Sequence, residues 1–158
     1  MREVDELAIA YIGIGSNLGN REKNCYRAIE LLEKRGVVVK KRSSVYETEP
    51  WGVPDQPQFM NMVLEVETEL EPYELLRELK AIEKEMGRRK TFKWGPRFID
   101  FDILLFDSLF LRDNSLQIPH PLMHERAFVL KPLCEIAPEK IHPLLKVRMC
   151  DLLEKLQE

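Results

Sequence analysis

The order of strand-like and helix-like hydrophobic patterns limits what this chain can fold into more than any other feature. In some segments apolar residues alternate with polar ones, as in a strand, and in others they recur every three or four positions, as on one face of a helix. The strand-like segments are Leu7–Gly15, Val37–Tyr46, Phe59–Leu70 and the apolar part of Trp94–Asp107, and the helix-like segments are Asn20–Arg35 and Pro72–Gly87. The predicted order is therefore strand, helix, strand, strand, helix, strand.

Local residues support these boundaries and lead to a fold class. Gly36 follows the first helical pattern as a stop, and Pro72 suits the first turn of the second helix. The predicted βαββαβ order is that of the ferredoxin-like plan, an α+β fold in which an antiparallel sheet has two helices packed on it. We expect a C-terminal extension after this unit, with one or two short helices and a last helix around Met149–Leu156.

Length and charge restrict the classes of protein that fit. A chain of 158 residues is large enough to bury a core without disulfides or metal, and we expect a single domain over residues 1–158. The net charge of -3 argues against a general surface for nucleic acid or anionic membranes, and no obligate protein partner is evident. Any anion-binding site is therefore expected to be local.

The N-terminal segment and the cysteines both predict a cytoplasmic protein. The N-terminal stretch "MREVDELAIAYIGIG" carries acids before its apolar run, which is not the pattern of a secretory signal, and no segment has the 18 or so unbroken apolar residues of a membrane span. Cys25, Cys134 and Cys150 are odd in number, widely scattered and form no C-x-x-C pair, so we expect buried free thiols rather than disulfides or a thiolate zinc site.

Two acids interrupt the apolar stretch "WGPRFIDFDILLFD". Residues two apart in a strand point to the same face, so Asp100 and Asp102 should emerge side by side with Cα atoms about 6.5 Å apart. A solvated strand face is the alternative explanation, but Phe98, Leu104 and Phe106 are expected on that same face, and solvation explains them poorly. All-oxygen ligands without His or Cys beside them favour Mg²⁺ over zinc.

A cluster of cations lies just upstream of the acids. It consists of Lys84, Arg88, Arg89, Lys90, Lys93 and Arg97. Alone, such a cluster most often forms a solvated surface or complements a helix C-terminus. Next to two acids that can hold Mg²⁺, it supplies what phosphoryl-type transfer requires, because that chemistry depends on positioning and charge neutralisation. A nucleoside triphosphate is the polyanion we expect.

Other motifs leave alternatives open. The P-loop pattern is absent, "GIGSNLG" lacks the spacing of a dinucleotide fingerprint, and its glycines are expected to shape a tight strand-to-helix turn. His120, between two prolines, is as consistent with a structural role as with phosphate contact, and neither Arg126 nor Phe128 is informative alone. The group Trp51, Phe59 and Asn61 can form a slot for a flat heterocycle, or simply a set of core aromatics under a loop.

Taken together, the motifs resemble the 6-hydroxymethyl-7,8-dihydropterin pyrophosphokinase family over nearly the whole chain. The stretches that carry the resemblance are "GSNLGN" (15–20), "YETEPWG" (46–52), "QPQFMN" (56–61), "EKEMGRRK" (83–90), "WGPRFIDFD" (94–102) and "IPHPLMHERAFVLKPLCEIAP" (118–138). The family's ferredoxin-like fold agrees with the predicted element order. The resemblance implies transfer of an intact pyrophosphoryl group from ATP to the pterin hydroxymethyl oxygen, with release of AMP.

The resemblance also implies roles for individual residues. Asp100 and Asp102 would hold two Mg²⁺ ions and, with Arg88 and Arg97, would be catalytic. The implied ATP-binding residues are Glu83, Arg88, Lys90, Trp94, Arg97, His120 and Arg126. The implied pterin-binding residues are Thr48, Trp51, Phe59, Asn61 and Phe128, with the ring between Phe59 and Phe128.

The chain departs from the family pattern at two cations, and two other functions compete. The family commonly has Arg where this chain has Lys90 and Lys93, and lysine lacks the planar two-point grip of arginine on phosphate. The chain ends near the last family motif, so no fused aldolase or dihydropteroate synthase domain is expected. The alternatives are a Mg²⁺-dependent nucleotide hydrolase that uses the same acids, and a ferredoxin-like RNA-binding module, against which the missing aromatic signature counts.

Overall fold

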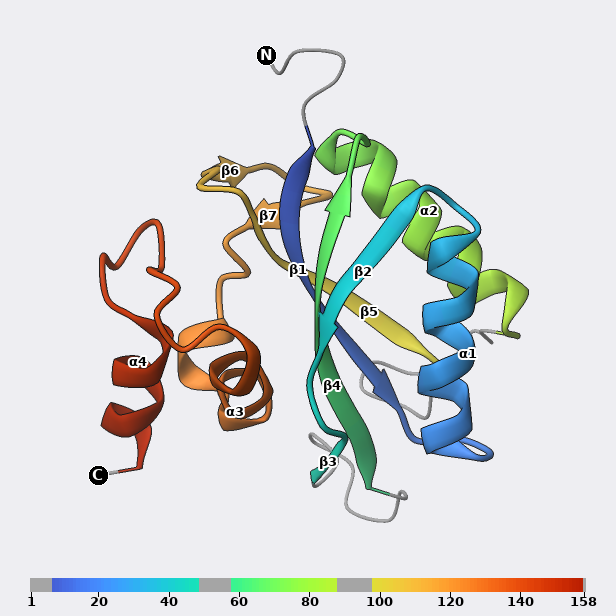
Figure 1. Ribbon diagram of the computed structural model, residues 1–158, viewed down its shortest axis with the longest axis horizontal. Helices are drawn as coiled ribbons and strands as arrows, with labels where there is room; N and C mark the ends of the chain where they lie inside the picture. Colours follow the sequence, from blue (N-terminus) through green and yellow to red (C-terminus); the bar gives the residue numbers. More distant parts are fainter. Residues whose placement is uncertain (1–6, 49–57, 88–97, 158) are drawn as a thin grey trace.

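The computed structural model describes residues 7–48, 58–87 and 98–157, and these form a five-stranded antiparallel sheet with helices on both faces and a separate two-stranded hairpin (Figure 1). Up to the end of the sheet the elements are β1 (Ala8–Ser16), α1 (Arg21–Glu33), β2 (Val37–Arg42), β3 (Tyr46–Thr48), β4 (Phe59–Thr68), α2 (Pro72–Glu85) and β5 (Asp100–Phe106). The C-terminal extension contains β6 (Leu111–Arg112), β7 (Gln117–Ile118), the 3-10 helix η1 (Met123–Glu125), α3 (Ala127–Ile136) and α4 (Met149–Leu156).

The strands pair in the order β2-β4-β1-β5, and every pairing is antiparallel. The expected mixture of helices with an antiparallel sheet is therefore confirmed. The single strand expected over Val37–Tyr46 is wrong, because the chain leaves the sheet at Ser43 and re-enters as β3, which also pairs with β4. The Ser43 hydroxyl accepts a hydrogen bond from the Val63 N–H and donates one to the Ser44 carbonyl, so a side chain replaces part of the backbone ladder there.

Helices α1 and α2 cover one face of the sheet, where the larger core lies (Figure 1). Alternate residues of β1 and β4 point into it, as the period of a strand requires. Pro72 occupies the first turn of α2, and Glu71 with Glu74 forms a capping box that satisfies free N–H groups at this end. The core residues from the two central strands are Ala8, Ala10, Ile12, Ile14, Met62, Leu64 and Val66.

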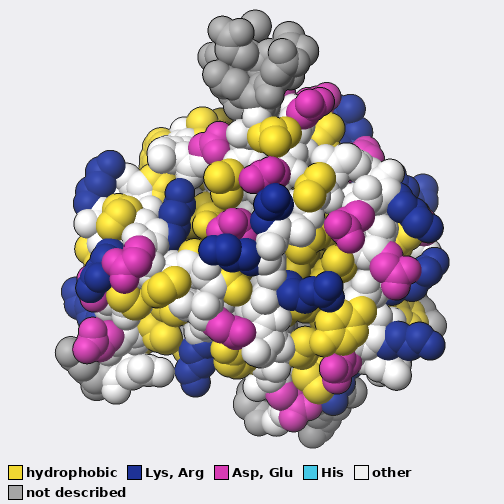
Figure 2. Space-filling model, viewed as in Figure 1, with side chains coloured by type: hydrophobic (Ala, Val, Ile, Leu, Met, Phe, Trp, Pro, Cys, Tyr) yellow, Lys and Arg dark blue, Asp and Glu magenta, His cyan; other side chains and the backbone are white. Residues whose placement is uncertain are grey.

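The opposite face is covered by α3, against which α4 packs from outside, and the sheet and these helices bury a second, smaller core (Figure 1). Tyr11 and Val63 contribute to it from the sheet, and Leu130 and Leu133 contribute from α3. No helix in the described parts of the chain combines the length and the apolarity that crossing a bilayer requires. On the face shown in Figure 2, cations and acids are interspersed, so that face presents no large field of one sign.

A bulge in β5 redirects its C-terminal half. Ile103 pairs with Ile12 but the next paired residue, Leu105, lies opposite Tyr11, so Leu104 is an extra residue on β5. Leu104 and Leu105 therefore both pack in the smaller core, and Phe106 returns to the larger one. The expectation that Phe106 shares a face with the acids is wrong for this reason.

Phe98 also differs from the expectation. It precedes β5 rather than lying in it, and its ring lies close to the turns at Gly19 and Gly87, where an added Cβ would be 3.4 and 3.8 Å from it. Both glycines have positive φ angles, so these turns need residues without a side chain. Phe98 thus packs where α1 begins and α2 ends.

Candidate active site

Two glycines of β1 form the floor of the candidate site. Gly15 lies between Asn61 of β4 and Asp100 of β5, and Gly13 lies between Val63 and Asp102. A Cβ added at Gly15 would lie 3.0 Å from Asn61 Oδ1, so the backbone itself forms the surface here. The expectation that these glycines shape a turn is wrong for Gly13 and Gly15, which lie within the strand.

The position of these glycines has a signal in the sequence. Residues 11, 13 and 15 share a strand face, and a face that changes from Tyr to Gly and Gly leaves open space beside its neighbours. Gly19, by contrast, has a φ of 67° and does shape the turn into α1. The role of a glycine in this motif therefore depends on its place relative to the strand end.

The two acids lie on the same face of β5, as predicted. Asp100 and Asp102 are both partly exposed, whereas the intervening Phe101 is buried in the larger core. Glu83, which is 4% exposed on α2, accepts a hydrogen bond from the Phe101 N–H at 2.9 Å. A buried carboxylate thus fixes the backbone between the acids, and this is where the structure places the predicted residue Glu83.

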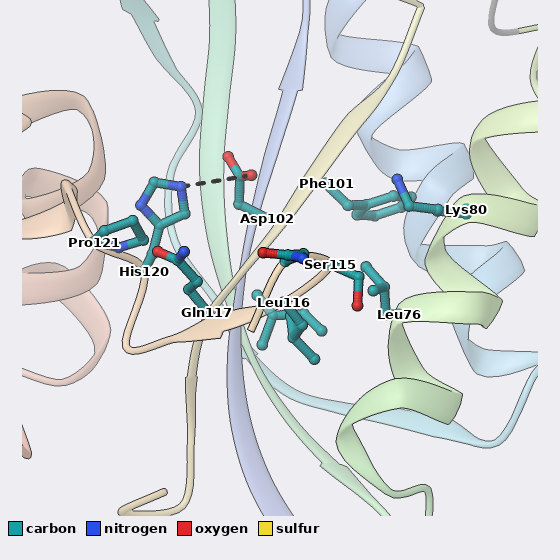
Figure 3. A pocket seen from close by; sticks show the side chains of 11 residues that line it. Leu76, Lys80, Phe101, Asp102, Ser115, Leu116, Gln117, His120 and Pro121 are labelled. Carbon is teal, nitrogen blue, oxygen red and sulfur yellow. Dashed lines mark ion pairs between the residues drawn. The ribbon is translucent and has the colours of Figure 1, made fainter. Parts of the chain in front are cut away.

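His120 lies next to Asp102. The backbone N–H of His120 donates a hydrogen bond to the Leu104 carbonyl at 3.0 Å, and this bond connects the segment after β7 to β5. Its Nδ1 accepts a hydrogen bond from the Leu122 N–H, so in the neutral ring the proton is on Nε2, which lies 3.9 Å from Asp102 Oδ1 (Figure 3). Burial and the charge of Arg126 lower the pKa of His120 to about 4, although Asp100 acts in the opposite direction. The imidazole is therefore neutral at pH 7 in the protein without ligands.

A cavity of about 280 Å³ opens beside Asp102 and His120 (Figure 3). Its lining is mixed, with apolar side chains from α2, β5 and the segment around β7 and a slightly larger number of polar or charged ones. The lining residues are Leu76, Lys80, Phe101, Asp102, Ile103, Asn114, Ser115, Leu116, Gln117, His120 and Pro121. Sequence reasoning missed most of these residues, because the β6–β7 hairpin and its contact with β5 leave no local motif.

The start of α3 brings two further predicted residues to this region. The Arg126 guanidinium carbon lies 5.5 Å from the centre of the Phe128 ring, and its charge acts on His120. Phe128 is half-buried and packs against the smaller core. Arg126, His120 and the two acids are thus brought together by three separate elements.

The predicted pterin-binding residues of β4 lie on the other side of the glycine floor. Phe59 and Asn61 are half-buried, and a Cβ at Gly15 would lie 3.4 Å from the Phe59 ring. Thr48 pairs with Phe59, and Tyr46 pairs with Asn61. An aromatic ring and an amide therefore stand across Gly15 from Asp100.

Several predicted residues lie outside the described residues. They are Trp51, Arg88, Lys90, Trp94 and Arg97, together with Arg89 and Lys93 of the basic cluster. Of that cluster Lys84, exposed near the end of α2, is described.

Comparison with known proteins gives the chain its family. Residues 11–138 match the model of the 7,8-dihydro-6-hydroxymethylpterin-pyrophosphokinase (HPPK) family. The 2-amino-4-hydroxy-6-hydroxymethyldihydropteridine pyrophosphokinase of Aquifex aeolicus is 46% identical over 140 residues, which cover 89% of this chain and 87% of the relative. Its Bacillus subtilis counterpart is 49% identical over 132 residues, which cover 83% of this chain and 79% of the relative.

A solved structure supports the fold independently of the sequence. The Plasmodium falciparum HPPK-DHPS crystal structure with pteroate superposes with a TM-score of 0.78 at 18% identity and covers 98% of this chain. This chain corresponds to 43% of that longer protein. The superposition supports the fold, while the family match and the two bacterial relatives confirm the resemblance found in the sequence, and the chain belongs to the HPPK family.

Proposed function

We propose that the glycine-floored site between β4, β1 and β5 carries out the pyrophosphokinase reaction of this family. The enzyme transfers pyrophosphate from ATP to 6-hydroxymethyl-7,8-dihydropterin, a step of folate biosynthesis, and AMP is released. The hydroxymethyl oxygen forms a bond to the β-phosphorus, the bond from that phosphorus to the α-β bridging oxygen breaks, and the hydroxyl proton is lost. The observation that carries the assignment is the pair of acids on one side of Gly13 and Gly15, with Phe59 and Asn61 on the other.

On the acid side we assign the cavity to ATP. Its apolar residues, among them Leu76, Phe101 and Leu116, offer surface to a flat base, and Asp102 and His120 at its lining mark where the phosphates would begin. The neutral His120 can donate its Nε2 proton to a phosphate oxygen without adding charge, and Arg126 supplies a cation nearby. The family resemblance adds Arg88, Lys90, Trp94 and Arg97, which lie outside the described residues.

The acids suit Mg²⁺ on the chemistry of their donor atoms. Asp100 and Asp102 offer hard oxygen ligands on one face beside bare glycine backbone. Within residues 7–48, 58–87 and 98–157 they belong to no group of three or more His, Cys, Asp or Glu side chains that could hold a metal, so phosphate oxygens and water would complete the shell, as Mg²⁺ prefers. We infer two ions, which when bound would neutralise phosphate charge and lower the proton affinity of the attacking hydroxyl.

On the other side we assign Phe59, Asn61 and Phe128 to the pterin. The Asn61 amide offers both a donor and an acceptor to the edge of a heterocycle, and the two rings offer faces for stacking. Thr48, opposite Phe59 in β3, and Trp51, outside the described residues, complete the set expected from the family. With the two substrates on opposite sides of Gly15, the binding site itself supplies proximity, and no covalent enzyme intermediate is needed.

Family membership favours transfer over the two alternatives, a nucleotide hydrolase and an RNA-binding module. The test is incubation with ATP and 6-hydroxymethyl-7,8-dihydropterin, followed by separation of the products. AMP and the pterin pyrophosphate are expected in equal amounts. ADP with free phosphate would contradict the assignment of this site. The Asn61→Ala variant should raise the KM for the pterin far more than the KM for ATP.

We also infer three broader properties. The strand order β2-β4-β1-β5 with α1 and α2 on one face supports the ferredoxin-like plan, with β3 as an added strand. The continuity of both cores through the central strands supports a single domain over residues 1–158. Free Cys25, Cys134 and Cys150 are consistent with a reducing compartment, and we propose the cytoplasm.

A further inference from the structure

Glu135, near the C-terminal end of α3, binds the segment that leads into β3. Its carboxylate accepts the Ser44 N–H on both oxygens at 3.0 Å, the Ser44 hydroxyl at 2.9 Å and the Tyr46 hydroxyl at 2.7 Å. Hydrogen bonds to an ionised acceptor are the stronger kind. Burial acts to raise the pKa of Glu135, but the bonds from Tyr46 and Ser44 outweigh it and lower the pKa, so the group is a carboxylate at neutral pH.

The Tyr46 ring that Glu135 holds is adjacent to the proposed pterin site. Tyr46 lies directly opposite Asn61 in the antiparallel pairing of β3 with β4, and residues opposite each other point to the same face with Cβ atoms about 5 Å apart. Two residues further along β3, Thr48 pairs with Phe59. The hydrogen bonds to Glu135 therefore hold the strand, β3, that pairs with Asn61 and Phe59.

Glu135 belongs to α3, the helix that also carries Phe128. Glu135 follows Phe128 by seven residues, which is close to two turns of an α-helix, so the two side chains leave α3 on the same face. Phe128 is thus fixed to the sheet at its own end by packing against the smaller core and at the far end of α3 by Glu135. The Glu135 carboxylate thus joins the helix that carries Phe128 to the strand that pairs with Asn61.

We propose that Glu135 is a positioning residue for the pterin, which sets the distance between Phe128 on one wall and Phe59 with Asn61 on the other. It touches neither substrate and acts through Tyr46 and Ser44. The inference rests on the proposed function, because it takes Phe59, Asn61 and Phe128 as the pterin site. A small error in this distance weakens stacking on both rings and misplaces the attacking hydroxyl.

The test is steady-state kinetics of Glu135→Ala at saturating concentrations of the second substrate. The KM for 6-hydroxymethyl-7,8-dihydropterin should rise about tenfold, while the KM for ATP stays within twofold of wild type, since the cavity and His120 are held by other elements. The Glu135→Gln variant, which keeps one acceptor oxygen, should recover part of the loss. A change of both KM values in proportion, or a pterin KM within twofold of wild type, would overturn the proposal.

A second variant removes the same bond from the other side and keeps the test valid if Glu135→Ala folds poorly. Tyr46→Phe loses only the hydroxyl, and we expect a threefold to fivefold rise in the pterin KM. The double variant should be no worse than Glu135→Ala alone, because both changes break one connection. Independent, multiplying effects would show that Tyr46 and Glu135 do not act together and would contradict the proposal.

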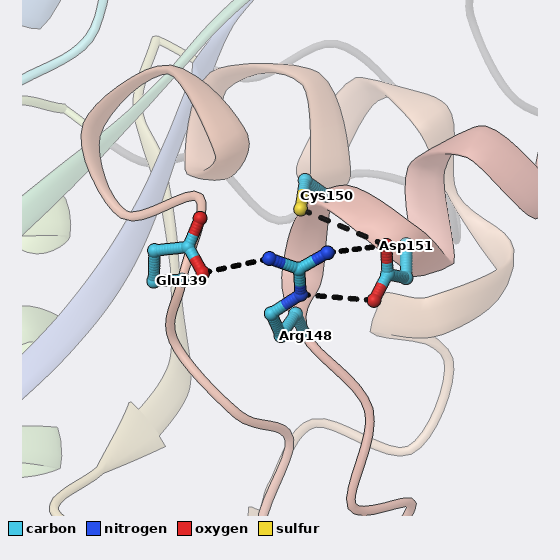
Figure 4. A network of polar contacts seen from close by, with 4 residues as sticks. All are labelled: Glu139, Arg148, Cys150 and Asp151. Atoms are coloured by element: carbon cyan, nitrogen blue, oxygen red, sulfur yellow. Dashed lines mark hydrogen bonds and ion pairs between the residues drawn. The ribbon is translucent and has the colours of Figure 1, made fainter.

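Two controls complete the design. Glu139 is an exposed acid a few residues further on, paired with Arg148 at 2.8 Å in a network away from β3 (Figure 4), so Glu139→Gln makes the same charge change without a kinetic effect. Phe59→Ala tests the proposed site itself. If it raises the pterin KM and Glu135→Ala does not, the positioning role fails and the site stands. If Phe59→Ala has no effect, both are overturned.

Discussion

On the face of β1 that meets α1 and α2, the side chains are Ala8, Ala10, Ile12 and Ile14, all buried, whereas the other face carries Tyr11 followed by Gly13 and Gly15. The same division runs through β5, where Phe101 and Ile103 enter the larger core and Asp100 and Asp102 stay partly exposed. Each strand thus places core side chains on one side and the glycines or the acids on the other, although Phe101 and Ile103 of β5 also line the cavity beside Asp102. Because side chains of a strand alternate, a substitution on one face leaves the other nearly untouched.

This separation has an energetic reason. We call the face that meets α1 and α2 the closed face, and the face with the acids and glycines the open face. Fully burying an aliphatic side chain stabilises the fold by about 1.5 to 3 kcal/mol, so burial on the closed face can offset the cost of holding two carboxylates side by side on the open face. The Glu83 carboxylate of α2 connects the two faces, because it accepts a hydrogen bond from the backbone of Phe101 between the two acids. Substitutions should therefore divide into those that change activity and those that change stability.

The largest effect is expected from the acids. Asp102→Asn keeps the shape of the side chain but removes its charge, and we expect kcat to fall about 10³-fold, the upper end of what one preorganised electrostatic contact contributes. The midpoint of thermal unfolding should change little, because the Asp102 side chain is partly exposed and Asn keeps its shape. An active variant would show that the open face is not where the chemistry occurs.

The closed face should give the converse result. Leu64, fully buried on β4, packs in the core between the sheet and the helices. Leu64→Ala should lower the free energy of unfolding by about 3 kcal/mol, through lost burial and a cavity, which is roughly 10²-fold in the unfolding equilibrium. Denaturant unfolding measures this loss. The kcat per folded molecule should stay within about twofold of wild type, and a large fall in kcat would mean that the two faces are coupled.

A smaller effect should follow from closing the glycine floor. The Cβ of Gly15→Ala would lie 3.0 Å from Asn61 Oδ1 and 3.4 Å from Phe59 Cδ1, so both side chains must shift by a few tenths of an ångström. We expect a rise of about tenfold in the pterin KM with little loss of stability. Gly13→Ala is the matched control, since its Cβ meets Leu104 at 3.7 Å or more, an ordinary contact. Equal effects of the two substitutions would contradict the assignment of the pterin to the Asn61 side.

The core-facing residues and the two acids could be predicted from the sequence better than the other parts of the fold. Periodicity gave α1, α2 and the central strands to within a few residues, since the pattern of buried residues repeats along each element. It missed the break at Ser43, where a hydroxyl replaces a backbone partner, and the bulge at Leu104, which moves Phe106 to the other face. Both depend on pairing between distant strands.

The sequence singled out two acids of the candidate site but not its surfaces. Asp100 and Asp102 stood out because they interrupt an apolar segment, whereas His120 between two prolines was equally consistent with a structural role. The cavity and the role of Glu135 depend on where the β6–β7 hairpin and α3 dock, and no local pattern encodes such docking. Family resemblance supplied Phe59, Asn61 and Phe128, whose spacing alone left core packing equally open.

The smallest effect concerns a histidine remote from the acids, and it tests whether stability can change with pH without a change in the site. His142 is 3% exposed, and its Nδ1 accepts the N–H groups of Leu144 and Leu145. Burial, His124 and Arg112 all lower its pKa, so in the folded state it stays neutral below the ordinary value of about 6.5. The unfolded chain then binds more protons than the folded one as the pH falls below that value, and stability declines.

His142→Asn keeps an acceptor near the Nδ1 position and removes the titrating group. Between pH 7.5 and 5 its free energy of unfolding should fall less than that of wild type, by a difference of at most about 1.4 kcal/mol per pH unit, which denaturant unfolding at each pH measures. The KM values for both substrates should be unchanged at pH 7.5, because the residue contacts neither face of the proposed site. If wild type and variant lost stability in parallel on acidification, His142 would be protonated in the fold as readily as outside it, and the carboxylates and His120 would account for the whole pH dependence.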